Sequence, residues 1–279
     1  MEALLSERLP EAVVCAPPEV LKSNVISACL RGLPQVPRLP AHDARAILCA
    51  GGPSLKRSLE EVRKRHRRGD TVFCVNKTSN YLIDNGIIPR CIVLCDPQEV
   101  LVDQFAADAR CAYLVASQCH PSVFNRLSGL EVHIWHCQCD SEKAWILPFY
   151  KDPVLASSGT TAALRTIDLV YVMGFRRLDI YGLDGSFEAG EDGKLAHHAY
   201  QQAEDDVPPV VEIIARNDNS EKRFWTRSDF ARQADEFMNV LHAYHAATKV
   251  IGVEPYRVTV HGDGLIPYLW RKRRQELHV

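Results

Sequence analysis

A glycine-rich turn that follows a short apolar run is the first feature with the character of a binding site. Residues 46–50 are apolar, and Gly51-Gly52-Pro53-Ser54 follow at once, ahead of a helical pattern. Glycine lets a backbone approach a phosphate closely, and the start of the next helix offers free amides and a positive dipole end. The turn lacks the ending of a Walker sequence and the spacing Gly-x-Gly-x-x-Gly. It therefore predicts phosphate contact outside those two motifs, with an ordinary tight turn as the alternative.

A second turn of this kind precedes a long apolar helical pattern. Ser158, Gly159 and Thr160 combine small hydroxyl side chains with a glycine at the expected start of that helix. Such a segment can form a second anion site. The alternative is simple capping of the helix by Ser157 or Ser158. Two such turns in one sheet protein favour phosphate binding.

Polar residues also follow other apolar runs. An asparagine such as Asn76 can hydrogen-bond a base or a ribose through its donor and its acceptor. Asp96 could ligate Mg²⁺, which prefers one or two carboxylates together with substrate phosphates, and Asp184 after Gly182 is the partner carboxylate. Ser117 ends a further run and is expected at the same edge. Each residue alone could be a turn residue or a cap.

Two adjacent histidines, His197 and His198, and a later one, His261, are the candidate acid–base groups. A histidine on a segment near the binding edge suits general base catalysis or phosphate contact. The alternative is that they are exposed loop histidines. The sequence does not say which of His197 and His198 points inward.

The elements that must position these residues alternate along the chain. Short apolar runs predict strands, and helical patterns separate them; the strands are expected at 46–50, 71–75, 91–95, 112–116, 131–136, 178–181 and 256–261. This alternation predicts a Rossmann-like α/β fold with a mostly parallel sheet and helices on both faces. In such sheets ligands bind at the carboxyl ends of the strands, so the polar clusters should converge on one edge.

The remaining segments divide the chain into three parts. Residues 1–43 contain six prolines and read as a lead-in with one short helix around 19–31. Residues 44–204 are the expected nucleotide-binding domain. Residues 205–279 are expected to complete it with a loop, helix, strand and helix. The stretch from 186 to about 225 is poor in apolar positions and predicts loops, which could form a lid or an ordinary insertion.

Composition limits the classes of protein. The 279 residues are 46% hydrophobic and 24% charged, with a net charge of −2. These values are typical of a globular protein and give no strong nucleic-acid signal. No apolar run is long enough to span a membrane, and the start of the chain does not resemble a signal peptide. A cytoplasmic location is therefore expected, and the sequence leaves an oligomer open.

Ten cysteines raise the question of metals and disulfides. Most of the cysteines considered, such as Cys49, Cys74 and Cys95, sit within apolar runs and are expected to be buried free thiols. The segment from His133 to Cys139 is the one metal candidate. It lacks a second pair of ligands at zinc-finger spacing, which favours a structural interpretation.

These motifs, in this order, resemble the MptE-like family. The resemblance is carried by Gly51-Gly52-Pro53-Ser54-Leu55, Asn76-Lys77, Asp96-Pro97, Ser158-Gly159-Thr160 and Tyr181-Gly182-Leu183-Asp184, within residues 44–204. That family includes archaeal 6-hydroxymethyl-7,8-dihydropterin pyrophosphokinases and a domain of flagellin-modifying glycosyltransferases. The same blocks are similar to those of bacterial sialyltransferases that use CMP-sialic acid. The segment around His197-His198 and the part after residue 204 look like phage and bacterial relatives without an assigned role.

The resemblance implies a nucleotide-dependent transferase acting on a small-molecule acceptor. In one branch ATP lies over Gly51–Ser54 and Ser158–Thr160, and Mg²⁺ on Asp96, with or without Asp184, bridges phosphates during attack by a pterin hydroxymethyl group. In the other branch Asn76 and the Ser-Gly turn hold a CMP-sugar, and His197 or His198 deprotonates the acceptor. A non-catalytic nucleotide-binding protein is the third hypothesis.

Overall fold

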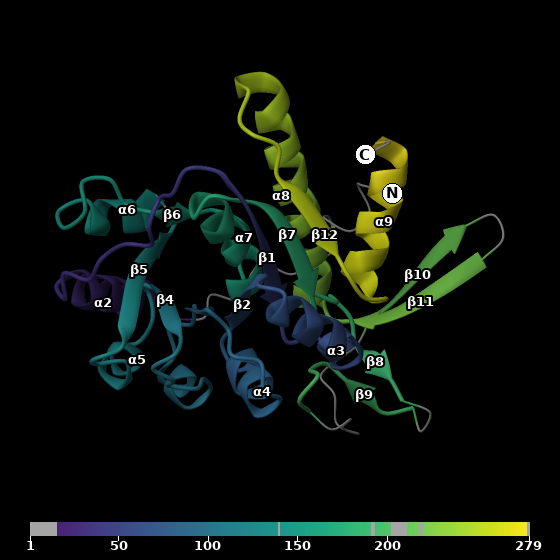
Figure 1. The fold of residues 1–279 in the computed structure, drawn as a ribbon, viewed down its shortest axis with the longest axis horizontal. Helices are drawn as coiled ribbons and strands as arrows, with labels where there is room; N and C mark the ends of the chain where they lie inside the picture. The colour runs from purple at the N-terminus through teal and green to yellow at the C-terminus, as the bar shows by residue number, and fades with distance from the viewer. Residues whose placement is uncertain (1–15, 139, 191–192, 202–210, 218–219, 278–279) are drawn as a thin grey trace.

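A single parallel sheet of eight strands organises the computed structural model (Figure 1). The structure describes residues 16–138, 140–190, 193–201, 211–217 and 220–277. The strands lie in the order β12-β7-β1-β2-β3-β4-β5-β6. Their bounds are β1 His42–Cys49, β2 Thr71–Val75, β3 Cys91–Leu94, β4 Ala112–Ala116, β5 Glu131–Cys137, β6 Leu155–Ala156, β7 Phe175–Tyr181 and β12 Arg257–Val260.

The order of the strands places a switch point between β1 and β7. From β1 the chain steps in one direction to β6, and from β6 it returns to β7 on the other side of β1. Crossovers between parallel strands are right-handed, so helices before and after the return lie on opposite faces of the sheet. In open α/β sheets ligands bind near such a switch point, beyond the carboxyl ends of the strands.

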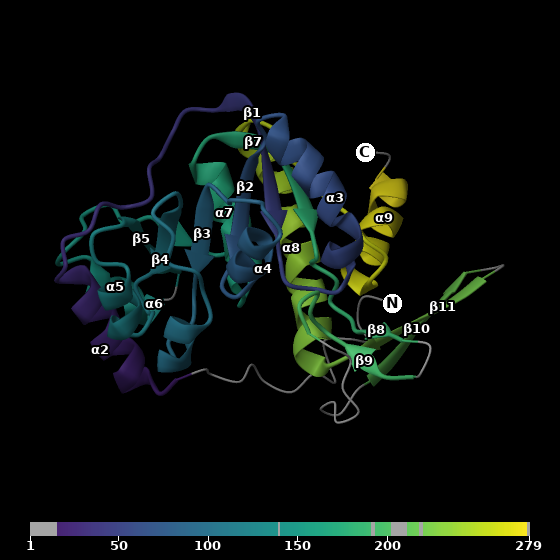
Figure 2. The same ribbon diagram turned by 60° about the horizontal axis from the view of Figure 1, so that its bottom comes forward.

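Helices and one short 3₁₀ turn connect the strands, as Figures 1 and 2 show. They are α2 Pro18–Cys29, α3 Ser54–Arg67, α4 Thr78–Asp84, η1 Glu99–Asp103, α5 Pro121–Arg126, α6 Asp140–Ile146, α7 Ala162–Val172, α8 Ser228–Ile251 and α9 Leu265–Leu277. The Rossmann-like α/β class predicted from the sequence is confirmed. Within the described residues, no helix has the length and apolarity that crossing a membrane requires.

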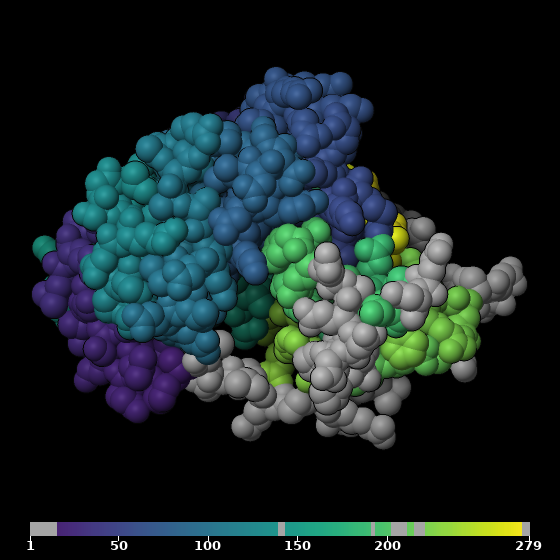
Figure 3. All heavy atoms as spheres, turned by 90° about the horizontal axis from the view of Figure 1, so that it is seen from below, coloured from purple at the N-terminus to yellow at the C-terminus, as the bar shows by residue number. Residues whose placement is uncertain are grey.

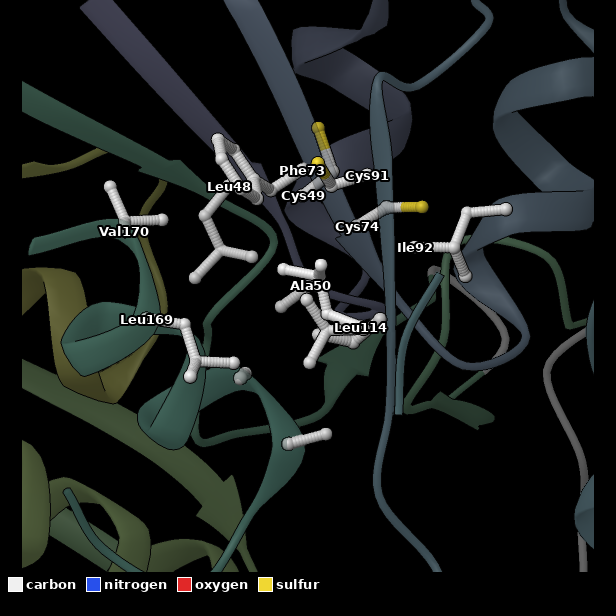
Figure 4. Close-up of a cluster of buried hydrophobic side chains, with 14 of the residues drawn as sticks. Leu48, Cys49, Ala50, Phe73, Cys74, Cys91, Ile92, Leu114, Leu169 and Val170 are labelled. Atoms are coloured by element: carbon white, nitrogen blue, oxygen red, sulfur yellow. The ribbon is translucent and has the colours of Figure 1, made fainter. Parts of the chain in front are cut away.

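The core lies on the central strands and is closed by α7. Leu48, Phe73, Ile92 and Leu114 are fully or almost fully buried, and Figure 4 shows several of these side chains together with Leu169 of α7. Strands buried on both faces read as continuous apolar runs, which is why these strands could be recognised from the sequence. Cys49 and Cys74 are buried free thiols in this core, as expected, whereas the free thiol Cys95, at the end of β3, is only partly buried.

The part after β7 differs most from the prediction. The expected loop region contains two small antiparallel pairs, β8 Glu188–Ala189 with β9 Leu195–Ala196, and β10 Val211–Asn217 with β11 Ser220–Thr226. Figures 1 and 2 show the β10–β11 hairpin extending away from the main sheet. A strand with so many charged positions lacks the apolar run of a buried strand, so its pattern resembled a loop.

Some predicted features lie outside the described residues. They are Cys139, the loop positions Glu191, Asp192, Asp218 and Asn219, and most of the N-terminal lead-in before α2. The helix expected around 19–31 is present as α2. β12 joins the edge of the same sheet, beside β7.

Candidate functional site at the carboxyl edge of the sheet

The predicted site residues follow the carboxyl ends of the strands. Asn76 follows β2, Asp96 follows β3, Ser117 follows β4, Ser158 follows β6, and Gly182 follows β7. Figure 3 looks onto this side and shows a hollow between the blue and teal atoms that follow β2 to β5 and the green atoms near residues 195–200. The sheet therefore brings the predicted residues to one edge.

The glycine turn after β1 packs tightly against the loop after β7. The amide of Gly52 donates to the carbonyl of Gly182 at 2.7 Å, and the amide of Ser54 donates to Oδ2 of Asp184 at 2.9 Å. A Cβ on Gly52 would lie 2.5 Å from Asp184 Oδ2 and 2.6 Å from the Gly182 carbonyl oxygen. Pro53 precedes the helix and is buried. The carboxylate of Asp184 thus occupies the start of α3, where the sequence predicted a phosphate.

Asp184 is a buried carboxylate with an unusual environment. The residue is 4% exposed, and this burial raises the pKa of its carboxyl group above the usual value. Hydrogen bonds from the side chain and the amide of Ser54 act in the opposite direction and lower this pKa. The carboxylate therefore holds the start of α3 against the switch point.

Asp96 and Asp184 are not brought together. The strands that they follow, β3 and β7, are separated by β1 and β2. Neighbouring strands lie about 4.8 Å apart, so three steps correspond to roughly 14 Å. Asp96 is partly exposed, and its Oδ1 accepts a hydrogen bond from the Gln98 amide at 2.9 Å. The coordination of an ion held by Asp96 would therefore be completed by substrate and not by Asp184.

Asn76 has a backbone conformation that marks it as a special position. Its φ of 40° is the only positive value among the non-glycine residues that the structure describes. Its side-chain Oδ1 accepts from the Cys95 amide at 3.3 Å, directly before Asp96. Strained residues of this kind cluster at functional sites, because the surrounding structure must hold them. The side chain links the ends of β2 and β3, where a base or ribose could be bound.

The second turn, before α7, is held by a carboxylate that the sequence analysis did not identify. Asp168 of α7 is 8% exposed and accepts from the amides of Ser157 and Ser158 at 2.6 and 2.8 Å. It also accepts from the hydroxyls of both serines and of Tyr244 on α8. The suggested capping of α7 by Ser157 or Ser158 is wrong, because the cap is Thr161, whose side chain accepts from the Leu164 amide. The two serines serve the buried carboxylate instead.

A second carboxylate covers the rest of this turn. Oε2 of Glu236, on α8, accepts from the amide and the hydroxyl of Thr160 at 3.0 and 2.9 Å. Gly159 has a φ of 62°, and a Cβ there would lie 2.9 Å from Glu236 Oε2. Asp168 and Glu236 occur within helical patterns, where spacing alone did not distinguish them from ordinary surface positions. An open cavity of about 480 Å³ lies beside this turn, lined on one side by α8.

His198 is the histidine that faces the glycine turn. Its Nδ1 lies 3.2 Å from the carbonyl oxygen of Gly51, and its ring stacks on Tyr200 with centroids 4.9 Å apart. A carbonyl only accepts hydrogen bonds, so Nδ1 carries the proton and Nε2 is the unprotonated nitrogen. Burial, together with the neighbouring His197, lowers the pKa of His198 to about 4. The imidazole is therefore neutral near pH 7.

His197 and His261 take other positions. The ring of His197 packs against His198 and Phe187, with centroids 4.1 and 5.7 Å away. His261 lies 2.7 Å from Asp179, and its ring stacks on Tyr181. Arg65 also binds Asp179, at 2.9 Å. His261 thus belongs to a charged network between α3, β7 and β12.

Ser117 and the thiols lie deeper in the same edge. The hydroxyl of Ser117 is fully buried and has no partner within the described part of the chain. Cys95 accepts from Gln118 Nε2 at 3.3 Å, and a hydrogen bond with the Cys137 thiol lowers its pKa.

Among the described residues no group of three or more histidines, cysteines or carboxylates could hold a metal ion. His133 contacts the Gln35 carbonyl and Glu131.

The parallel sheet, its switch point and the polar loops at one edge define an α/β protein of Rossmann-like type. The chain belongs to the MptE-like family, described as 6-hydroxymethylpterin diphosphokinase MptE-like, whose model matches residues 26–190. The resemblance found in the sequence motifs is thereby confirmed.

A glycosyltransferase is among the solved structures with a similar fold. The MAf glycosyltransferase from Magnetospirillum magneticum AMB-1 superimposes with a TM-score of 0.60 at 15% identity, over 89% of this chain and 37% of that one. This chain thus spans little more than a third of that protein. A mammalian sialyltransferase gives a TM-score of 0.42 at 12% identity, over 93% of this chain and 88% of that one. No curated protein matches the sequence.

Proposed function

We propose that the protein is a nucleotide-dependent transferase that passes a diphosphate from ATP to a hydroxymethyl group on a small acceptor such as a pterin. The observation that carries this proposal is the family match, because residues 26–190 include every predicted strand-end loop from Gly51 to Asp184. The family description names a diphosphokinase of this type. Nucleotide binding at the carboxyl edge agrees with the general behaviour of such sheets.

The residues at the edge have the chemistry that this reaction needs. Asn76 offers an amide group for the nucleoside, and the Thr160 hydroxyl, now bonded to Glu236, could turn to a phosphate that replaces this carboxylate. Lys77 supplies a positive charge next to Asn76, with its Nζ 5.6 Å from the Tyr200 ring centroid. Phosphoryl-type transfer depends mainly on positioning and charge neutralisation, so no covalent role for the protein is required.

Asp96 fits Mg²⁺ in the way that nucleotide enzymes commonly hold it. Magnesium is usually bound by one or two carboxylates, with waters and substrate phosphates completing its coordination. The partly exposed Asp96 supplies one such carboxylate at the edge, next to Asn76. A bound ion would neutralise phosphate charge. Asp184 fits this role less well, since one of its oxygens is bonded to the Ser54 amide.

Glycosyl transfer from a nucleotide sugar such as a CMP-sugar is the second candidate. It is favoured by the neutral His198, whose unprotonated Nε2 could accept a proton from an acceptor hydroxyl, and by the fold shared with the MAf glycosyltransferase. The pKa of about 4 makes His198 a weak base, so this role would require the substrate to change its surroundings. A non-catalytic nucleotide-binding protein is the third candidate.

Calorimetric titration with ATP, CTP, CMP and UDP, each with and without Mg²⁺, separates these functions. Diphosphate transfer predicts that ATP binds only with Mg²⁺ and that Asp96→Ala abolishes this binding. The matched control is Asp103→Ala, an exposed carboxylate in the loop after the same strand. Binding of CMP or CTP without metal supports glycosyl transfer, and binding without turnover supports the non-catalytic role. No response to any of these nucleotides would overturn the transferase proposal.

A further inference from the structure

Three arginines lie side by side across the sheet, toward the amino ends of its strands. Arg257 of β12 is in register with Arg177 of β7, and Arg177 is in register with Arg45 of β1. Residues in register on neighbouring parallel strands point to the same face of the sheet, and the strands are about 4.8 Å apart. All three residues are exposed. They form a line of positive charge across three strands, which we call the arginine row.

The fold compensates this charge only weakly. Like charges at neighbouring positions of adjacent strands destabilise a sheet. Within the described chain the row has one ion pair, 3.9 Å long, between Arg177 and the fully exposed Asp43, and a pair of this kind contributes little. Asp179, two positions after Arg177, is already bonded to Arg65 and His261. The charge of the row is therefore left for a partner outside the chain.

The end of α3 extends the positive surface. Arg65 of α3 binds Asp179, so Asp179 points to the face that α3 covers, and the arginine row points to that face too. Lys64, Arg67 and Arg68 are exposed in the last turn of α3, just before β2 begins. Their charges also favour the C-terminus of the helix. The three side chains place further cations at the amino ends of the strands.

Exposed apolar side chains project from the same end of the sheet. Val250 and Ile251 end α8 and are 80% and 71% exposed. The segment that follows them leads into β12, and its Glu254 forms an ion pair of 3.3 Å with Arg176, next to Arg177 in β7. Figure 1 shows α8 extending beyond the sheet at this end. The arginine row and this apolar tip, Val250–Ile251, therefore lie at one end of the molecule.

The combination of cations and an apolar tip discriminates between anionic partners. Arginine forms paired hydrogen bonds with phosphate and carboxylate groups, so the row alone would fit any surface that carries them. A nucleic-acid backbone would leave the apolar tip in water. The surface of an anionic bilayer offers charged head groups and, just below them, acyl chains that accept apolar side chains. The two features together favour a bilayer surface.

We propose that the amino end of the sheet binds the surface of an anionic membrane, with the arginine row on the lipid head groups and Val250–Ile251 at their boundary with the acyl chains. The contact is peripheral and needs no helix that crosses the bilayer. It goes beyond the proposed function and does not depend on it. The carboxyl edge, at the opposite ends of the strands, would face away from the membrane and stay open to substrates.

Sedimentation of the full chain with lipid vesicles, in the absence of nucleotide, tests the proposal. Vesicles of phosphatidylcholine alone are compared with vesicles of phosphatidylcholine and phosphatidylglycerol in equal parts. We expect binding to the anionic vesicles to be about tenfold stronger or more, and to weaken as the salt concentration rises. Combining Arg45→Gln, Arg177→Gln and Arg257→Gln should lower this binding about tenfold or more. The unfolding free energy of this variant should not fall, because the substitutions remove repulsion between like charges.

A second variant and a matched control complete the design. Val250→Ser with Ile251→Ser leaves the charge unchanged and should weaken vesicle binding about threefold or more. The control combines Arg31→Gln, Arg126→Gln and Arg223→Gln, which remove the same charge from exposed positions beside α5 and on β11. This control should bind anionic vesicles nearly as well as the unaltered protein.

The outcomes separate this proposal from the proposed function. Equal binding to neutral and anionic vesicles, no binding to either, or equal losses in the two arginine variants would overturn the membrane proposal. Stronger binding to a DNA duplex than to anionic vesicles, lost with the arginine row, would also overturn it. Each of these results leaves the nucleotide titrations unaffected, because vesicle binding is measured without nucleotide and the titrations without lipid. The comparison of vesicles uses the unaltered protein, so the proposal stays falsifiable even where a variant does not fold.

Discussion

The two turns that the sequence marks as anion sites are built differently. At the glycine turn after β1 the partner is Asp184, which is almost fully buried and bonded to the Ser54 amide. At the turn before α7, one partner is the buried Asp168, and the other, Glu236, reaches Thr160 from the more accessible face of α8. Both turns bind an anion, but in each the anion belongs to the protein. The first is therefore a fixed joint, and only the second has a carboxylate that a ligand could replace.

The largest effect is expected from substitution within the fixed joint. Gly52→Ala places a methyl group 2.5 Å from Asp184 Oδ2 and 2.6 Å from the Gly182 carbonyl oxygen, so backbone or a bonded carboxylate must move. We expect a loss of about 4 kcal/mol in the free energy of unfolding, measured by urea denaturation. The control is Gly86→Ala, which has a φ of 73° and open space around it. It is expected to cost about 1–2 kcal/mol from the backbone conformation alone. Equal losses in both variants would contradict the tight joint.

The contrast also explains which parts of the molecule could be predicted. Short buried strands and the polar residues that follow them lie close in sequence, so β1 to β5 and the positions of Asn76 and Asp96 could be read from local pattern. The partners of the two turns are distant: Asp184 lies 130 positions from Ser54, and Glu236 lies 76 from Thr160. Such pairings depend on how the chain returns across the sheet, which local pattern does not contain.

The hairpin shows the same limit at the level of whole elements. β10 and β11 carry Glu212, Lys222 and Arg223 in a two-stranded ribbon, and Ile213 opposite Phe224 is one of the few apolar pairs. A ribbon with so little buried surface takes its stability from packing, here of Phe224 against Tyr268 of α9. Without knowledge of that contact, the composition of this segment is that of a loop.

The buried carboxylate of the second turn gives the next largest effect. Asp168→Asn replaces an oxygen that accepts several bonds with an amide nitrogen that can only donate, leaving Ser157, Ser158 or Tyr244 without an acceptor. We expect a loss of about 2–3 kcal/mol in unfolding free energy. Hydrogen exchange should show faster opening of residues 157–160, whereas Asp235→Asn on α8 serves as the control. A change in global stability without faster exchange at this turn would contradict the assignment.

The pH dependence of stability tests how the histidine segment covers the fixed joint. The pKa of His198 is lowered from about 6.5 to about 4 in the folded protein, so the unfolded chain binds this proton first. Its contribution to stability is complete above pH 6.5 and is lost as the pH falls from about 6.5 toward 4. His136, whose pKa burial also lowers to about 4, adds to the same loss. His198→Gln should flatten the slope in this window in urea titrations, and an unchanged slope would show that His198 is not buried against Gly51.

The smallest expected effect concerns the carboxylate that a ligand could replace. Glu236 places a negative charge on the amide and hydroxyl of Thr160, where the sequence predicted a phosphate. Removing it in Glu236→Ala should change the unfolding free energy by less than about 1 kcal/mol, because the pair is solvent-accessible. The affinity for a nucleoside triphosphate should rise about fivefold, since a competing anion at the start of α7 is gone. Asn239→Ala, three residues later on α8 and beside the same cavity, should leave the affinity unchanged. Weaker binding in Glu236→Ala, measured by calorimetry at fixed ionic strength, would mean that Glu236 assists the ligand and that the second turn is as fixed as the first.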